Sequence, residues 1–136
     1  MKRIVVRGLL MAVAIAAVAA SAAAHHALQA VFDTNKWVSV SGPIDKVEWI
    51  NPHSYISLDV TGKDGKTQRW AWEFGGTGVL HQSGMSRADR GGLKPGDPIT
   101  VEGFPAKDGS PTGFVQKLKF PDGRVFVFRT NDPNAR

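Results

Sequence analysis

Apolar residues form one block near the start of the chain and afterwards alternate with polar residues. The block covers residues 4–20 and begins beside three basic side chains, Lys2, Arg3 and Arg7. Beyond residue 36 the apolar positions recur mostly with a period of two, which indicates half-buried β-strands rather than helices. The pattern therefore divides the chain into an N-terminal leader and a β-rich body.

Six segments of the body are predicted to be strands. Between the second and third, residues 62–65 read Gly-Lys-Asp-Gly, a sequence typical of a hairpin turn. In the first, the apolar parity changes between Ile44 and Val47, which predicts a bulge or bend near Gly42-Pro43. The predicted strands are residues 37–50, 53–60, 67–74, 99–104, 114–120 and 125–129.

Residues 75–92 interrupt this alternation and predict a short helical insertion. Thr77 is expected to cap one helical turn that ends at Gly84, and Ser86 with Asp89 has the spacing of a capping box. Three strands, a short helical insertion and two or three further strands follow the order of an OB-type barrel. We therefore predict an all-β, OB-like closed barrel of five to six strands; an open sandwich of the same strands is the alternative.

The first 24 residues have the layout of a secretory signal peptide: basic residues, an apolar stretch, then small residues. Cleavage is expected after Ala24 or one residue earlier, with an uncleaved N-terminal anchor as the alternative. The apolar stretch is short and alanine-rich for a membrane span of about 20 residues. We therefore expect a periplasmic mature protein without a membrane span. The expected organisation is a signal peptide over 1–24, an N-terminal arm over 25–35, a barrel over 36–130 and a polar tail over 131–136.

Composition narrows the classes of function. The chain of 136 residues has no cysteine, so no disulfide or lipid-modified cysteine is expected. Its net charge of +5 falls to +2 without the leader, which is far from the basic footprint of a nucleic-acid-binding domain. The glycine-rich residues 75–78 lack the Lys-Ser/Thr of a phosphate-binding loop. No nucleophile, base and orienting group stand at a useful spacing, so neither an enzyme nor any catalytic residue is expected.

Several residues are expected to be structural. Four aromatic residues have inward parity and are predicted to be core residues, with a stacking platform for a ring ligand as the alternative: Trp49, Trp70, Trp72 and Phe74. His81 is predicted to lie on the surface of the helical insertion. Four basic residues are expected to form a solvated outer edge that discourages edge-to-edge pairing. They are Lys117, Lys119, Arg124 and Arg129.

The histidine pair after the leader is the first candidate for chemistry. Cleavage after Ala24 leaves His25 with a free α-amine, its imidazole and the His26 ring beside it. Cleavage one residue earlier places a histidine third in the mature chain. Nitrogen donors in a tetragonal arrangement favour Cu(II) or Ni(II), so both termini are suited to one copper ion. The alternative is that the two histidines lie on a mobile arm or pack against the barrel.

A second candidate lies on the outer face of the predicted second and third strands. The even-numbered residues point inward, so cross-strand partners must have even number sums, and both plausible registers gather His53, Tyr55 and Glu73 outside. A sum of 128 pairs Tyr55 with Glu73 and, favourably, Asp59 with Arg69. A sum of 126 places His53 opposite Glu73. We predict the first register.

This outer-face cluster leaves three interpretations open. It can hold a metal, with His53 joining His25 and His26 if the arm folds across the face. It can bind a small molecule or partner protein, with Tyr55 and Glu73 as contact residues. It can also be a hydrogen-bonded group that only orders the surface. The two functional hypotheses are therefore an exported copper-binding protein and a metal-independent adaptor or binding module.

The order of several motifs resembles the domain-of-unknown-function family 6152, which comprises small exported bacterial proteins. The resemblance covers essentially the whole mature chain and implies export and a small β-rich domain, without an activity or ligand. Its most specific elements are the histidine pair after the leader and the Asn-Pro-His between strands. The matching segments are His25-His26-Ala27, Phe32-Asp33, Asn51-Pro52-His53, Trp70 with Trp72-Glu73, Leu93-Lys94-Pro95-Gly96-Asp97, Val101-Glu102-Gly103 and Lys107-Asp108-Gly109-Ser110.

Overall fold

The computed structural model describes residues 28–85 and 92–128. The signal peptide, the histidine pair, the second capping motif and the polar tail predicted above lie outside these residues. Residues 28–31 form a short helical segment, and the barrel unit begins at Phe32. The elements of the barrel unit are β1 (Val38–Glu48), β2 (His53–Thr61), β3 (Thr67–Gly75), α2 (Thr77–Gln82), β4 (Pro98–Pro105), β5 (Thr112–Lys119) and β6 (Val125–Val127).

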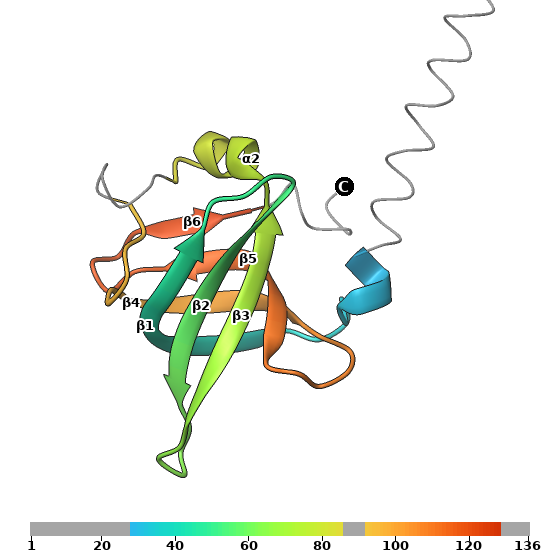
Figure 1. Cartoon of the computed structure of the whole chain (residues 1–136), viewed down its shortest axis with the longest axis vertical. Coiled ribbons are helices and arrows are strands. Elements are labelled where there is room, and N and C mark those ends of the chain that lie inside the picture. The colour runs from blue at the N-terminus through green and yellow to red at the C-terminus, as the bar shows by residue number, and fades with distance from the viewer. Residues whose placement is uncertain (1–27, 86–91, 129–136) are drawn as a thin grey trace, which may run out of the picture. The chain divides into compact units, whose positions relative to one another are not determined.

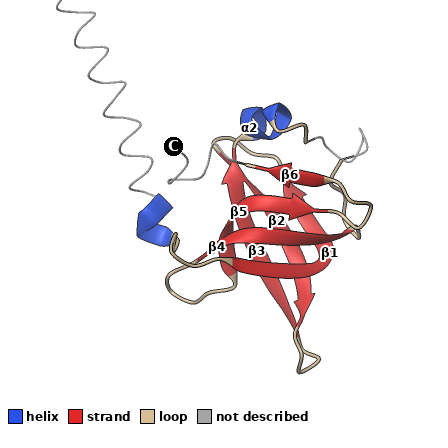
Figure 2. Ribbon diagram, turned by 180° about the vertical axis from the view of Figure 1, so that it is seen from behind, coloured by secondary structure: helices blue, strands red, loops and turns tan. Residues whose placement is uncertain are grey.

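Five strands close into a barrel. The sheet order is β3-β2-β1-β4-β5-β6, and an additional pairing joins β3 to β5 (Figures 1 and 2). This closing contact is the only parallel one among the described strands; it pairs Ala71 with Thr112, Trp72 with Gly113 and Glu73 with Phe114. β6 adds to β5 outside the closed ring. The OB-like closed barrel with a helix after the third strand is confirmed, and the open sandwich is excluded by the β3–β5 pairing.

The long first strand joins both halves of the barrel. Its first half pairs with β4 and its second half with β2. The register with β2 shifts between Ile44 and Lys46, so the bulge predicted from the parity change between Ile44 and Val47 is confirmed and lies at Asp45. Gly42 allows a close strand approach, because a Cβ there would lie 2.3 Å from the carbonyl oxygen of Asp59.

The barrel interior holds one hydrophobic core. Trp72 and Phe74 are fully buried, as predicted, whereas Trp49 and Trp70 are only partly buried and pack against the core from its margin. Gly113 opposes Trp72, whose ring leaves no room for a side chain at that position. The other core residues are Ile44, Ile56, Leu58, Leu80, Met85, Leu93, Ile99, Val101, Val115, Leu118, Phe120 and Phe128.

Helix α2 follows β3 and contributes the buried Leu80 to the core. Gly76 occupies the cap position and Thr77 is the first helical residue, so the prediction that Thr77 caps the helix is wrong. The Asn51 side chain, from the connection between β1 and β2, supplies the acceptor instead: its Oδ1 accepts hydrogen bonds from Thr77 N (3.0 Å) and Thr77 Oγ1 (3.1 Å). None of the helices in the described part of the chain is long and apolar enough to cross a membrane.

The solvated basic edge predicted for the C-terminal strands is wrong in the case of β5, which is an interior strand of the sheet. Lys117 and Lys119 both pair with the carboxylate of Glu102 on β4, which is almost fully buried. The hydrogen bond from Lys119 is the main cause that lowers the pKa of Glu102, and burial opposes it. Arg124 pairs with the neighbouring Asp122.

Candidate functional site

The hairpin of β2 and β3 sets the geometry of the candidate site. Tyr55 pairs with Glu73 and Asp59 pairs with Arg69, so the predicted register is confirmed. His53 lies opposite Gly75 and therefore diagonal to Glu73. Cross-strand partners share a face, which places Tyr55 and Glu73 together on the outer face of the barrel.

The carboxylate of Glu73 contacts the other two residues of this cluster, His53 and Tyr55. Its Oε1 contacts Nδ1 of His53, and its Oε2 accepts a long hydrogen bond of 3.5 Å from the hydroxyl of Tyr55. The carboxylate side chain is 22% exposed, and the imidazole of His53 is 51% exposed. The three residues that sequence reasoning assigned to this face are thus brought together by one carboxylate.

This contact selects the tautomer of a neutral His53. A carboxylate only accepts hydrogen bonds, so a neutral imidazole beside it donates from Nδ1 and keeps its lone pair on Nε2. Histidines that ligate metals commonly donate their other ring nitrogen to a carboxylate in the same way. In this neutral tautomer His53 offers Nε2 as an acceptor or as a ligand.

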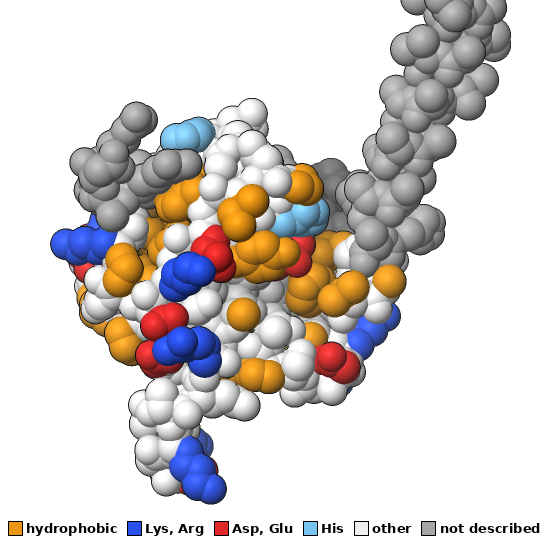
Figure 3. Space-filling model, viewed as in Figure 1, with side chains coloured by type: hydrophobic (Ala, Val, Ile, Leu, Met, Phe, Trp, Pro, Cys, Tyr) orange, Lys and Arg blue, Asp and Glu red, His pale blue; other side chains and the backbone are white. Residues whose placement is uncertain are grey.

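The cluster belongs to a row of aligned residues that runs around the barrel. The cross-strand pairs place Glu48, Tyr55, Glu73, Phe114 and Phe104 side by side on β1, β2, β3, β5 and β4. In the space-filling view of the β1–β3 face, acidic, histidine and hydrophobic side chains adjoin one another (Figure 3). One row therefore combines two carboxylates, a phenol and two phenyl rings.

The environment raises the pKa of the Tyr55 hydroxyl. Burial is the largest cause, followed by the negative charge of Glu73, the hydrogen bond to Glu73 and the charge of Glu48. The phenol is therefore held in its protonated form and remains a hydrogen-bond donor.

Aromatic residues at the other end of the row were not assigned to the site from the sequence. Phe114 contacts the ring of Phe32 at 5.5 Å between centroids, and Phe104 contacts Trp37 edge-on at 5.7 Å. Trp37 is itself 53% exposed, and Ile50, in the connection before His53, is 47% exposed. The signal for Trp37 was present in the sequence as an aromatic residue at the start of the first strand, but its position depends on the pairing of β1 with β4.

The Asn-Pro-His motif has a structural explanation. Asn51 holds the start of α2, and Ser54 closes the connection because its buried Oγ donates to the carbonyl of Ile50 (3.0 Å). The loop packs closely on Gly76, where a Cβ would lie 2.6 Å from Asn51 Oδ1. These contacts fix the position at which β2 begins and therefore where His53 stands.

Metal ligands are sparse in the described part of the chain, which holds no group of three or more histidine, cysteine or acidic side chains suited to an ion. His53 and Glu73 can provide at most two ligands. His25 and His26 lie outside the described residues. His81 is exposed on α2 and stacks on Trp49 at 6.3 Å, in agreement with its predicted surface position.

A second polar group lies further along the same face. Arg69 contacts Asp59 through Nε (3.0 Å) and Asp45 through Nη2 (3.0 Å). Asp45 occupies the bulge of β1, which brings its carboxylate to this arginine. One guanidinium thus bridges two carboxylates, one on β2 and one on β1, and the group holds the hairpin of β2 and β3 against β1.

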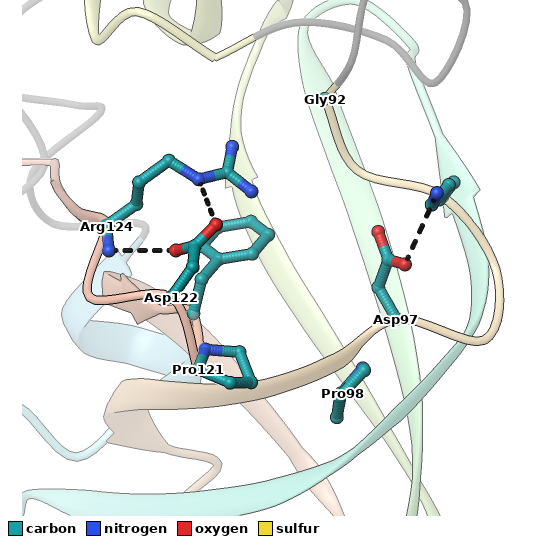
Figure 4. Close-up of a pocket in the computed structure, with 8 residues that line it drawn as sticks. Gly92, Asp97, Pro98, Pro121, Asp122 and Arg124 are labelled. Atoms are coloured by element: carbon teal, nitrogen blue, oxygen red, sulfur yellow. Dashed lines mark hydrogen bonds and ion pairs between the residues drawn. The ribbon is translucent and has the colours of Figure 1, made fainter.

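Hollows occur elsewhere on the barrel. One of 280 Å³ lies beside the turn before β6, where Asp122 pairs with Arg124 and Lys94 with Asp97 (Figure 4). Arg124 also lies 4.4 Å from the centre of the Phe120 ring. Because each of these charged groups already has a partner, this hollow is not well suited to a charged ligand.

Comparison with known proteins gives one family. No curated protein matches the chain significantly. Among solved structures, the N-terminal domain of the PriB protein from Thermoanaerobacter tencongensis, described as dimeric, is similar with 14% identity and a TM-score of 0.44. The match covers 62% of this chain and 94% of that one. A family model described as a family of unknown function, DUF6152, matches residues 12–116. The resemblance seen in the sequence motifs is thereby confirmed, and the chain belongs to the DUF6152 family.

Proposed function

We propose that this protein is an exported, periplasmic binding protein that holds a partner protein on the outer face of its barrel. His53 would accept a hydrogen bond through Nε2, and Tyr55 and Glu73 would form the polar centre of the contact. The observation that carries the proposal is that one carboxylate contacts both His53 and Tyr55. A polar group arranged in this way is preorganised, so little side-chain entropy is lost on binding.

The surroundings of the cluster support a protein partner. Trp37 and Ile50 are large apolar side chains that remain about half exposed; Trp37 packs against Phe104, and Ile50 lies in the connection before His53. Interfaces between proteins are enriched in exposed aromatic anchors around a few well-placed polar groups. The ring of Phe104 packs against Trp37, and the ring of Phe114 packs against Phe32. Both phenylalanines are buried beneath these contacts.

The experiment is quantitative capture of partners from periplasmic extract by the purified mature protein. We expect the double variant His53→Ala, Glu73→Ala to lose most of the captured partner. The matched control is Asp59→Ala, Arg69→Ala, which removes an ion pair from the same face without touching the cluster. Equal capture by the wild type and the His53, Glu73 variant would reject the proposal. Loss of capture in the control alone would instead assign the binding surface to the region around Asp59 and Arg69.

A second candidate is copper binding, which the orientation of His53 favours. The contact between Glu73 and Nδ1 leaves Nε2 available to a metal. The processed N-terminus, with the amine and the rings of His25 and His26, is the other proposed source of nitrogen ligands.

Titration of the mature protein with Cu(II) tests this candidate. We expect uptake of about one ion, loss of uptake in His25→Ala, and an affinity lower by about 10- to 100-fold in Glu73→Gln if His53 is a ligand. His81→Ala is the control, because His81 is an exposed histidine on α2. Equally weak binding by the mature protein and by a form with extra residues before His25 would contradict the copper candidate and leave the partner surface unaffected.

A further inference from the structure

The hairpin of β2 and β3 extends beyond the rest of the barrel, at the end opposite α2 (Figure 1). A hollow of 590 Å³ lies along its inner side, where the hairpin faces the first half of β1. This volume lies within the range of small-molecule sites, about 300–1,000 Å³. The residues around it are Val40, Val60, Gly62, Asp64, Lys66, Thr67, Gln68 and Trp70.

The floor of this hollow is apolar and contains an aromatic surface. Val40, Val60 and Trp70 point toward the core side of their strands but are only partly buried. The indole of Trp70 stacks on Trp72, with 5.7 Å between ring centres and an angle of 20°. Trp72 is fully buried and fixes Trp70 from one side. The side of Trp70 that lines the hollow can therefore receive another flat ring.

The rim of the hollow carries one cation, Lys66, and one carboxylate, Asp64. Within the described residues, the ammonium of Lys66 has no ion-pair partner. The carboxylate of Asp64 accepts a hydrogen bond from the backbone N–H of Lys66 (3.1 Å), which holds it against the turn backbone rather than against the ammonium. With Lys63 the turn has two lysines against one aspartate, which favours an anion at this end of the barrel.

We propose that this hollow binds a small planar aromatic anion, which stacks on Trp70 and places its charged group near Lys66. The inference goes beyond the proposed function, because the hollow and the outer-face cluster share no residue. Val40, Val60 and Gln68 also line the hollow. In this arrangement the two valines would contact the ring, and the amide of Gln68 would be available to the charged group.

The test uses 1-naphthoate as the anionic probe and 1-naphthamide as its neutral counterpart, added to the ¹⁵N-labelled protein. The chain has four tryptophans, so four indole N–H signals report on different parts of the molecule. We expect naphthoate to shift the signal of Trp70, assigned with Trp70→Phe, while those of Trp37 and Trp49 remain unchanged. The amide should bind more weakly than the carboxylate.

Variants on exposed positions separate recognition from folding. Lys66→Gln should weaken naphthoate binding about two- to fivefold and leave the amide unaffected, as expected for one exposed charge. Gln68→Glu introduces a negative charge at the rim and should weaken naphthoate further. Gln82→Glu, the same change on an exposed position of α2, is the matched control and should bind as the wild type does.

Three results would overturn the inference. The first is the absence of any naphthoate-dependent shift of the Trp70 signal. The second is equal binding of the carboxylate and the amide together with no effect of Gln68→Glu. The third is a shift that depends on protein concentration alone, which would assign the hollow to contact between copies of the chain.

Discussion

Glu73 determines the chemistry of the outer face at the scale of single residues. Its carboxylate contacts the side chains of both His53 and Tyr55, and its position follows from the register of one hairpin. Its loss would free the imidazole to rotate and leave the phenol without an acceptor. The effect can be followed at Tyr55, because the chain contains a single tyrosine.

Substitution Glu73→Gln should lower the pKa of Tyr55 toward its ordinary value. Glu73 raises that pKa both through its charge and through its hydrogen bond, and only burial contributes more. The measurement is a spectrophotometric titration of tyrosinate, with circular dichroism to verify that the fold is intact. Glu48→Gln is the matched control and should lower the pKa less, because the charge of Glu48 is the smallest of the causes. An unchanged pKa in Glu73→Gln would contradict the contact.

At the scale of elements, helix α2 depends on a residue from another part of the chain. Asn51 accepts two hydrogen bonds from Thr77, although 26 residues separate them. The connection between β1 and β2 therefore performs the role that a cap residue usually performs within a helix. The same contact links the helix to the loop that precedes His53.

Asn51→Ala should destabilise the protein by about 0.5–2 kcal/mol, which is the usual cost of losing an N-terminal cap. The free energy of unfolding in urea measures the effect. Thr77→Val is the matched comparison: it removes only the hydroxyl contact, keeps the backbone N–H bond to Asn51, and should cost less. A smaller loss in Asn51→Ala than in Thr77→Val would show that the backbone bond contributes nothing.

The stability of the contact between β3 and β5 should be sensitive to a single added methyl group. A Cβ at Gly113 would lie 2.4 Å from the Trp72 ring, so Gly113→Ala forces the largest core side chain to move. We expect a loss of about 1–3 kcal/mol of stability, as for other overpacked cores. Gly78→Ala is the control: its Cβ meets no atom within 4 Å, and alanine in α2 should instead stabilise by about 0.5–1 kcal/mol. Equal effects of the two substitutions would contradict the tight fit.

At the scale of the whole molecule, the fold was largely predictable from the sequence and its long-range contacts were not. The parity of the strand residues and the Gly-Lys-Asp-Gly turn restrict the hairpin to two registers, and the opposite charges of Asp59 and Arg69 favour the one that pairs Tyr55 with Glu73. These signals are local in the chain.

Contacts between distant segments left no such signal. The hydrogen bonds from Thr77 to Asn51 and the pairing of Glu102 with Lys117 and Lys119 each depend on how remote segments meet. A lysine on a strand contributes the same polar position to the sequence alternation whether its side chain faces solvent or a buried carboxylate. For this reason the basic edge was predicted as solvated.

Stability of the whole molecule should respond to pH through Glu102. Its pKa is lowered in the folded protein, mainly by the hydrogen bond from Lys119. The folded state therefore binds this proton less readily than the unfolded state. The stabilisation is present above the ordinary carboxyl pKa and is lost as the pH falls through the lowered value. In Glu102→Gln this part of the pH dependence should disappear.

The measurement is the free energy of unfolding of both proteins from neutral to acidic pH. The difference between wild type and Glu102→Gln should be largest at neutral pH and shrink on acidification. Asp122→Asn, with a pKa also lowered but on an exposed turn, provides the comparison and should show a smaller difference. A difference that grows toward acidic pH would contradict the assignment.

The short parallel contact that closes the barrel also has a consequence for how the chain folds and opens. It pairs Ala71 with Thr112, 41 positions apart, whereas the hairpin of β2 and β3 pairs near neighbours. Closing a long loop costs more chain entropy than closing a short one, so the hairpin is expected to form early and this seam late. The amides along the seam should then exchange with deuterium before those in the middle of the hairpin, and the barrel should open as a sheet along this line.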